Sequence, residues 1–158
     1  MIRSRAEWMR HQGLRDWDAW MSSADLMAAR ATRPRTAAWL LVHGDGSVVG
    51  CTTVSAVVPD EGWTAREHTE SALYLSTTCT DPAWREHRPG TRLVTWALAY
   101  AGQTGAATLR RSCQGPGLLR LYRDVQGFDL VRTVSDGGSP THLLARATSG
   151  GSPKAGSL

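Results

Sequence analysis

Helical spacing of apolar residues marks the first thirty positions. Residues 5–12 have the pattern of one helix, and a stripe in steps of three and four predicts a second. That stripe consists of Trp17, Trp20, Met21 and Ala24. The segment "RATRPR", residues 30–35, breaks the pattern, since proline and a loss of apolar spacing end helices. The chain therefore begins with two helices.

Short apolar runs separated by turn residues predict strands further along. "TAAWLLVH", "GDGS" and "VVGCTTVSAVV" predict a β-hairpin over residues 36–58. A polar loop is expected over 59–71 and a strand over 72–79. Three further strands are expected, at "ATLRRSC", "FDLVRTV" and "THLLARA".

Two apolar stripes in the second half predict helices. The first gives a helix over 91–102, with Thr91 as its N-terminal cap. The second gives a helix that Gly127 ends. The second stripe consists of Leu118, Leu121, Tyr122 and Val125.

This order of elements predicts an α/β (α+β) fold, with a mixed sheet covered by helices. The strand over 72–79, the following helix and the strand over 107–113 are expected to form a right-handed parallel crossover. Open sheets bind their ligands beyond the carboxyl ends of such strands. A chain of 158 residues fits one domain, expected over 1–147 and followed by a flexible Gly/Ser-rich tail over 148–158.

Composition adds limits to this picture. Apolar residues make up 41% and charged residues 20%, as in soluble globular proteins. No run approaches the ~20 apolar residues of a membrane span, and the first residues lack the apolar core of a secretory signal. Three cysteines suggest reduced core thiols of a cytoplasmic protein, and the scattered histidines suggest no metal site. The net charge of +4 permits an acidic ligand.

The stretch "WREHRPGTRL" carries the candidate chemistry. It lies at the N-terminus of the predicted helix, where unpaired backbone N–H groups and a partial positive charge attract phosphates. Gly90 lets the backbone approach a ligand closely. Arg85, Arg88 and Arg92 add guanidinium groups suited to phosphate oxygens. The alternative is that these are ordinary solvated arginines on a Pro-Gly turn.

The segment from Ala72 to Val134 resembles the core of the GNAT superfamily of acyl-CoA-dependent N-acetyltransferases. That family has a strand, a loop of the form R/Q-x-x-G-x-G/A, a helix, a second strand and a helix with a tyrosine before Gly-Phe. Arg85 and Gly90 match the loop, Arg88 stands at its first glycine, and "LLRLYRDVQGF" resembles the tyrosine helix. Upstream, "EWMRHQGLRDW" resembles actinobacterial members. The resemblance implies a mostly antiparallel sheet, splayed in the middle.

The function that this resemblance implies is transfer of an acetyl (acyl) group from acetyl-CoA to an amine of a small molecule or peptide, by direct attack. It implies Tyr122 as general acid and, less directly, Glu70 as base, with Glu67 and His68 as alternatives. No metal, nucleic acid or membrane is expected, and a homodimer is one expected assembly. The residues expected to bind the donor are Thr78, Cys79, Thr80, Arg85, Glu86, His87, Arg88, Pro89, Gly90 and Thr91.

Two sets of alternatives stay open at this point. Four residues separate Tyr122 from Gly127, where the family has three, so either a local bulge absorbs the extra residue or Arg123 takes the tyrosine's place. The chain could also be a non-catalytic member of the fold that binds acyl-CoA or a partner. A nucleic-acid-binding protein ranks lower, because no basic recognition helix is present.

Overall fold

The computed structural model describes residues 1–135 and 137–148. Contacts divide the chain into two compact units. The first unit comprises Met1–Ser55 and Leu75–Leu93, and the second comprises Ala56–Tyr74 and Val94–Leu158. The expected tail over 148–158 lies outside the described residues, apart from Thr148. No helix in the described ranges is long and apolar enough to cross a membrane.

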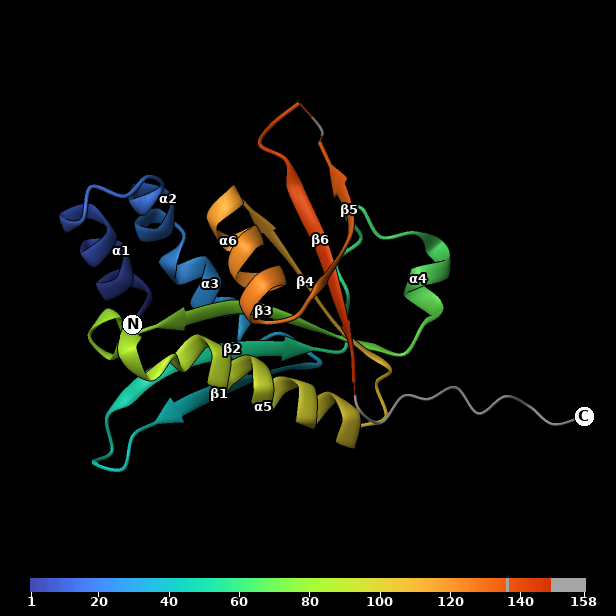
Figure 1. Cartoon of the computed structure of the whole chain (residues 1–158), viewed down its shortest axis with the longest axis horizontal. Helices are drawn as coiled ribbons and strands as arrows, with labels where there is room; N and C mark the ends of the chain where they lie inside the picture. The colour runs from blue at the N-terminus through green and yellow to red at the C-terminus, as the bar shows by residue number, and fades with distance from the viewer. Residues whose placement is uncertain (136, 149–158) are drawn as a thin grey trace, which may run out of the picture. The chain divides into compact units, whose positions relative to one another are not determined.

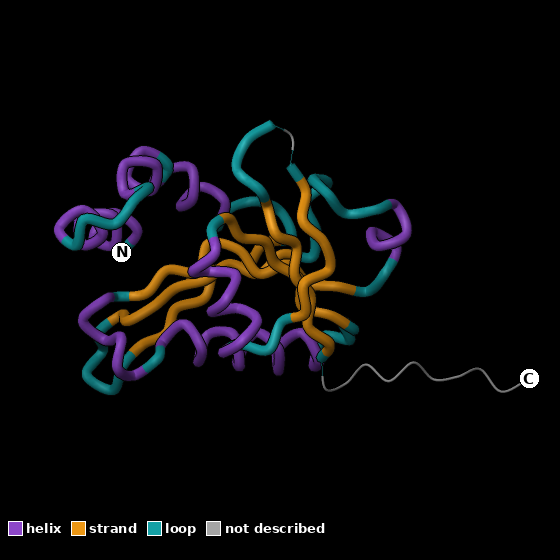
Figure 2. The backbone as a smooth tube through the Cα atoms, turned by 45° about the horizontal axis from the view of Figure 1, so that its top comes forward, coloured by secondary structure: helices purple, strands orange, loops and turns teal. Residues whose placement is uncertain are grey.

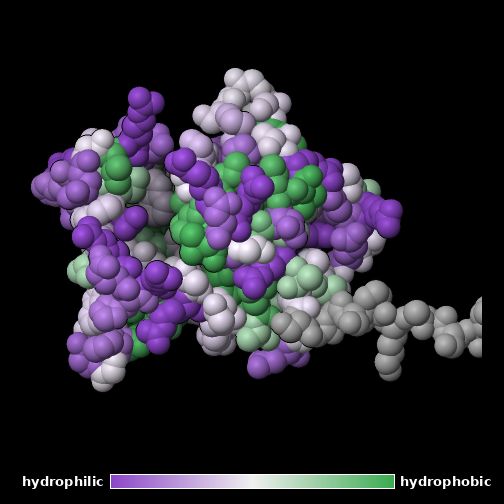
Figure 3. Space-filling model, in the orientation of Figure 1, coloured by the Kyte–Doolittle hydropathy of each residue, from purple (hydrophilic) through white to green (hydrophobic). Residues whose placement is uncertain are grey.

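Three short helices open the first unit (Figure 1). They are α1 (Ile2–His11), α2 (Trp17–Ser22) and α3 (Ala24–Arg30). The predicted second helix is thus two helices, because the chain turns at Ser23, which ends α2 and precedes α3. Arg3 of α1 donates two hydrogen bonds of 2.8 Å to the carboxylate of Asp25 in α3. The surface of these helices is largely hydrophilic (Figure 3).

The predicted hairpin is confirmed. Strands β1 (Thr36–Val42) and β2 (Val48–Ser55) pair antiparallel and run side by side in Figure 2. Strand β3 (Ala72–Thr80) neighbours β2, and its segment from Leu75 onward belongs to the first unit. A short 3₁₀ helix, η1 (Pro82–His87), and helix α5 (Pro89–Gln103) follow.

Strand β3 contains a bulge at Thr77 that the sequence did not reveal. Thr77 has a φ of 47°, which is rare for a β-branched residue. On one side of it, the hydroxyls of Thr78 and Thr52 lie 2.9 Å apart, and on the other those of Ser76 and Thr53 lie 2.7 Å apart. One extra residue of β3 is therefore accommodated between these two contacts, which interrupts the regular ladder.

The remaining strands belong to the second unit. The first three residues of β3, Ala72–Tyr74, pair parallel with the start of β4 (Thr108–Gln114). Strand β4 pairs antiparallel with β6 (Thr141–Ala147), and β6 pairs antiparallel with β5 (Asp129–Val134). The strand order is β1-β2-β3-β4-β6-β5. The mixed, mostly antiparallel sheet with flanking helices confirms the predicted fold class.

Two predictions for the second unit need correction. The expected polar loop over 59–71 contains helix α4 (Ala65–Thr69), which begins with a capping box between Thr64 and Glu67. The expected helix before Gly127 consists of α6 (Pro116–Arg120) and a π-helical turn, η2 (Leu121–Val125). Three residues of its apolar stripe are exposed: Leu118, Leu121 and Val125 are 41%, 38% and 54% exposed, and hydrophobic residues gather over this region in Figure 3.

Candidate functional site

The predicted donor-binding loop is a continuous path from η1 into α5. Asp81 caps η1, since its Oδ1 accepts a hydrogen bond of 2.9 Å from the N–H of Ala83. Helix α5 begins at Pro89 and not at the predicted Thr91. Proline suits the first position of a helix because its φ is fixed and no N–H is needed there. The N–H of Thr91 donates to the carbonyl of Arg88 at 3.0 Å, so Thr91 lies in the first turn and does not cap the helix.

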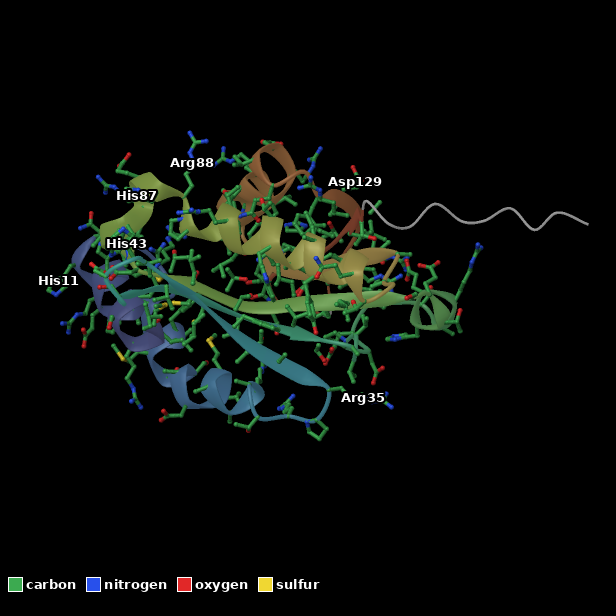
Figure 4. All side chains as sticks on the ribbon, turned by 90° about the horizontal axis from the view of Figure 1, so that it is seen from below. His11, Arg35, His43, His87, Arg88 and Asp129 are labelled. Atoms are coloured by element: carbon green, nitrogen blue, oxygen red, sulfur yellow. The ribbon has the colours of Figure 1, made fainter. Side chains whose placement is uncertain are left out.

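Arg88 joins η1 to α5 in a left-handed conformation, with φ 50° and ψ 49°. Glycine adopts this conformation freely, whereas a residue with a Cβ adopts it at a cost of about 1–2 kcal/mol. Arg88 stands at the position where the resemblance expects the first glycine of the loop. The arginine therefore keeps a glycine-like backbone path while adding a guanidinium, which is exposed and projects away from the ribbon in Figure 4.

Most backbone donors of this loop are already engaged. The N–H groups of Ala83, Trp84 and Arg88 bond to Asp81 or Arg85 within the turn. Pro89 has no N–H, and Gly90, at the second helical position, keeps its N–H outside the helical ladder. A bound anion would therefore depend more on guanidinium groups than on backbone amides.

The charged side chains of the loop reach solvent. Arg85 Nε lies 3.1 Å from Glu86 Oε1, and these side chains are 73% and 82% exposed. His87 and Arg92 are exposed as well. An exposed ion pair contributes little free energy, so a diphosphate can displace Glu86 from Arg85. These residues fit an anionic ligand, and the carboxylate of Glu86 opposes such a ligand.

Ring contacts brace η1 against the turn between β1 and β2. The ring centroid of Trp84 lies 4.4 Å from that of His43 and 5.3 Å from that of His87. Figure 4 shows both histidines at the same end as Arg88. A hollow of about 530 Å³ flanks the loop on the side of α1. It is lined by Ser4, Trp8, Asp81, Pro82, Ala83, Arg85 and Glu86.

The end of β3 supplies the other predicted donor-binding residues. Thr78 meets the hydroxyl of Thr52, and Cys79 is 2% exposed. The packing around Gly50 is tight on the side of α5: a Cβ on Gly50 would lie 3.0 Å from a methyl group of Leu93 and 3.5 Å from the Thr80 methyl. Thr78, Cys79 and Thr80 therefore lie in a tightly packed strand end that leads into the loop.

Tyr122 belongs to the second unit and is buried, with 9% of its surface exposed. The N–H of Gln126 donates to the carbonyl of Leu121, and that of Phe128 donates to the carbonyl of Tyr122. These hydrogen bonds span more residues than those of an α-helix, so the helix has a local bulge here. Arg123, which was the alternative to Tyr122 at the tyrosine position, is exposed. The π turn absorbs the extra residue, so Tyr122 is the buried residue of this helix.

Arg111 of β4 lies against Tyr122. It is 3% exposed, and its guanidinium carbon lies 3.4 Å from the centroid of the tyrosine ring. It also donates a hydrogen bond of 3.1 Å to Oε1 of Gln126. Burial raises the pKa of Tyr122, and the nearby Arg111 charge partly opposes this. Tyr122 therefore carries its proton at neutral pH, as a general acid must.

The predicted base, Glu70, forms an ion pair with Arg110 of β4, which is 2% exposed. Arg110 also donates to the carbonyl of Glu67 at 2.7 Å and lies over the ring of Trp63. Trp63 is 6% exposed, so it covers the strand. The Glu70 side chain remains 47% exposed, and its role as base stays a prediction.

The two alternative bases have other partners. Glu67 accepts hydrogen bonds from the backbone and side chain of Thr64 and pairs with Arg132. The hydrogen bond from the Thr64 backbone lowers the pKa of Glu67, with smaller contributions from Arg132 and Arg110. Glu67 is therefore a weak base and not the solvated loop residue expected. His68 Nε2 lies 3.8 Å from Oδ1 of Asp60.

In residues 1–135 and 137–148, no three His, Cys, Asp or Glu side chains are grouped as metal ligands. Sequence reasoning missed Thr77, Arg110 and Arg111. A T-x-x-E pattern at Thr64 signals α4, but nothing local in the sequence distinguishes a buried arginine from an exposed one.

Comparison with known proteins places the chain in a family. The profile of the acetyltransferase (GNAT) family matches residues 3–128, and the chain belongs to this family. A search of curated proteins finds no match.

Several solved structures share the fold. An aminoglycoside 6'-acetyltransferase type Ii has a TM-score of 0.65 at 14% identity, over 93% of this chain and 90% of that one. The ribosomal-protein-S18-alanine N-acetyltransferase from Escherichia coli has a TM-score of 0.61 at 15% identity, over 82% and 80%. A nourseothricin acetyltransferase has a TM-score of 0.57 at 22% identity, over 73% of this chain and 66% of that one. At these identities the likeness establishes the fold alone.

Proposed function

We propose that this protein is an acetyl-CoA-dependent N-acetyltransferase acting on an amine of a small molecule or peptide. Its membership of the acetyltransferase (GNAT) family supports this proposal. The observation that carries it is the loop before α5, where Arg88 keeps a left-handed backbone and Arg85, Arg88 and Arg92 present exposed guanidinium groups at a helix N-terminus.

Acetyl-CoA supplies the acetyl thioester. Arg85, Arg88 and the N–H of Gly90 would hold its diphosphate, because guanidinium groups bind phosphate oxygens in pairs. The backbone of Thr78, Cys79 and Thr80 would bind the pantetheine arm by hydrogen bonds.

The second unit would supply proton transfer. Tyr122, buried and protonated, would donate its phenolic proton to the departing thiolate, with the Arg111 charge above its ring stabilising the phenolate that results. Glu70 would accept a proton from the attacking amine, directly or through water. A carboxylate held beside Arg110 keeps its position while about half of its side chain stays open to solvent.

The finer predictions belong to this proposal as well. We propose a cytoplasmic protein of actinobacterial type that requires no metal, binds neither nucleic acid nor membranes, and forms a homodimer. The alternative is a member of the family that binds acyl-CoA without turnover. The loop favours that alternative in one respect, since its backbone N–H groups are largely engaged and Glu86 pairs with Arg85.

A thiol-release assay separates the two functions. The protein is incubated with acetyl-CoA and a panel of aminoglycosides and peptide N-terminal amines, and free CoA thiol is followed with a chromogenic disulfide. The proposal predicts amine-dependent thiol release for at least one class. Thermal stabilisation by acetyl-CoA without thiol release on any amine would instead support the non-catalytic function.

A further inference from the structure

Two thiols of the first unit face each other across β2 and β3. The N–H of Asp81 donates to the carbonyl of Val49 at 3.0 Å. Counting two residues inward from this contact on each antiparallel strand places Cys51 opposite Cys79. The neighbouring hydroxyls of Thr52 and Thr78 lie 2.9 Å apart, which fits the same pairing of the two strands. The bulge of β3 lies beyond this pair, so it does not disturb the alignment.

Opposite positions in antiparallel strands suit a disulfide. Their Cα atoms are about 5.5 Å apart in a hydrogen-bonded pair, and disulfides span about 4.4–6.8 Å between Cα atoms. The Cys79 thiol is the largest influence on the pKa of the Cys51 thiol, as expected for facing side chains. Both are free thiols, so both are available to form a disulfide.

The two thiols differ in chemistry. The hydrogen bond from Cys79 lowers the pKa of Cys51 to about 7, and the same contact together with burial raises the pKa of Cys79. Cys51 is partly exposed, whereas Cys79 is 2% exposed. Thiols attack disulfides best when their pKa is close to the ambient pH. Cys51 therefore has the properties of an attacking thiol, and Cys79 faces it as the second thiol of the pair.

We propose that Cys51 and Cys79 form a thiol-modification site that reacts with low-molecular-weight disulfides and closes an internal disulfide. In the first step the Cys51 thiolate attacks the small disulfide, forms a mixed disulfide and releases one small thiolate. In the second step Cys79 passes its proton to the small thiolate released in the first step, attacks the Cys51 sulfur and releases the second small thiolate, which takes a proton from water. Two protein thiols are oxidised and one small disulfide is reduced to two thiols, so electrons and atoms balance.

This thiol chemistry goes beyond the proposed function, and it involves the strand end proposed to bind the donor. A disulfide between Cys51 and Cys79 would join β2 to β3 next to Thr78. A disulfide between residues 51 and 79 restricts the unfolded chain, so oxidation raises the midpoint of thermal unfolding and a dithiol reductant reverses the change.

The test uses oxidised glutathione on the full chain at pH 7.5, with intact-mass measurement and peptide mapping under non-reducing conditions. We expect the wild type to lose two hydrogens and to yield a peptide pair linked through Cys51 and Cys79. Cys79→Ser is expected to keep glutathione on Cys51, because no resolving thiol remains. Cys51→Ser is expected to stay unmodified.

Cys113 provides the matched control, because it is buried in the second unit and burial raises its pKa. Cys113→Ser is expected to form the cross-link as the wild type does. The wild-type result decides the matter even where a variant fails to fold. An unmodified wild type, a wild type that accumulates glutathione on Cys51 without a cross-link, or a cross-link through Cys113 overturns the proposal.

Discussion

Arginines play opposite parts in the two units. In the first unit, Arg85 and Arg88 of the loop are exposed, and Arg85 forms an ion pair with Glu86, which is exposed as well. In the second unit, Arg110 and Arg111 of β4 are 2% and 3% exposed and are committed to internal contacts. The first pair is available to a ligand, whereas the second pair is part of the fold.

The two pairs of arginines should therefore contribute differently to the free energy of unfolding. Removing a buried charged side chain leaves its space unfilled and its buried partners unsatisfied, which costs several kcal/mol, whereas exposed ion pairs contribute about 0–1 kcal/mol. Substitutions on β4 should therefore change stability, and substitutions in the loop should change donor binding. Variants of both regions test this contrast.

The largest effect is expected for Arg110→Ala. This change leaves the carboxylate of Glu70 and the carbonyl of Glu67 without their partner and removes the cation over Trp63. We expect the free energy of unfolding to fall by about 3 kcal/mol, measured by urea denaturation. Arg120→Ala, an exposed change in α6, is the control and should alter stability by less than about 0.5 kcal/mol. Equal stability of the two variants would refute the division between regions.

Tyr122→Phe is expected to reduce turnover by about a hundredfold, because general acid catalysis commonly contributes 10²–10⁴. The ring, and with it the contact to Arg111, is retained, so the fold and the apparent KM for acetyl-CoA should change little. Steady-state kinetics with the best amine of the panel measures both parameters. A variant with the full rate would remove Tyr122 from the mechanism and leave it as a core residue.

Arg88 allows stability and binding to be separated at one position. Arg88→Ala retains a Cβ, and with it the conformational cost of the left-handed backbone, but it loses the guanidinium. Affinity for acetyl-CoA should therefore fall about tenfold. Arg88→Gly should lose the same affinity while gaining up to about 1 kcal/mol of stability, because glycine adopts φ 50° freely. Calorimetry and denaturation of both variants check this pair of results. An Arg88→Gly variant that binds acetyl-CoA as the wild type does would show that the guanidinium makes no contact with the ligand.

The smallest expected effect is a gain in affinity for acetyl-CoA. Glu86→Gln removes the charge that opposes phosphate and frees Arg85 from its ion pair. We expect acetyl-CoA to bind about threefold more tightly, in line with the modest strength of exposed pairs. Titration at low and high salt should show that the gain shrinks as salt screens the charge. Weaker binding by Glu86→Gln would mean that Glu86 contacts the ligand favourably.

Apolar spacing and turn residues predicted most elements, because hairpins and amphipathic helices depend on local patterns. Helix α5 begins two residues before the predicted Thr91, because proline suits the first helical position and Pro89 and Gly90 belong to the first turn. The loop over 59–71 hid a capping box at Thr64 and Glu67. Both errors concern chemistry that is visible in the sequence.

Other features depend on contacts between distant residues and had no local signal. The positive φ of Thr77 reflects how β3 meets β2, and no residue preference points to it. The burial of Arg110 depends on Glu67 of α4, and that of Arg111 depends on Tyr122 of η2 and on Gln126, which follows η2. The spacing of Tyr122 indicated that a bulge could exist, but only packing decided between Tyr122 and Arg123. Loop residues could therefore be predicted as candidates, whereas their energetic roles could not.

The central claim is that the loop before α5 binds the diphosphate of acetyl-CoA. The most direct test is calorimetric titration of the wild type and of the Arg85→Ala/Arg88→Ala double variant with acetyl-CoA and with S-acetylpantetheine, which lacks the nucleotide and its diphosphate. The account predicts that the double variant loses about a hundredfold in affinity for acetyl-CoA, from two charge-assisted contacts, and keeps its weak affinity for S-acetylpantetheine. Unchanged affinity of the double variant for acetyl-CoA, or a wild type that ignores acetyl-CoA at millimolar concentration, would contradict it.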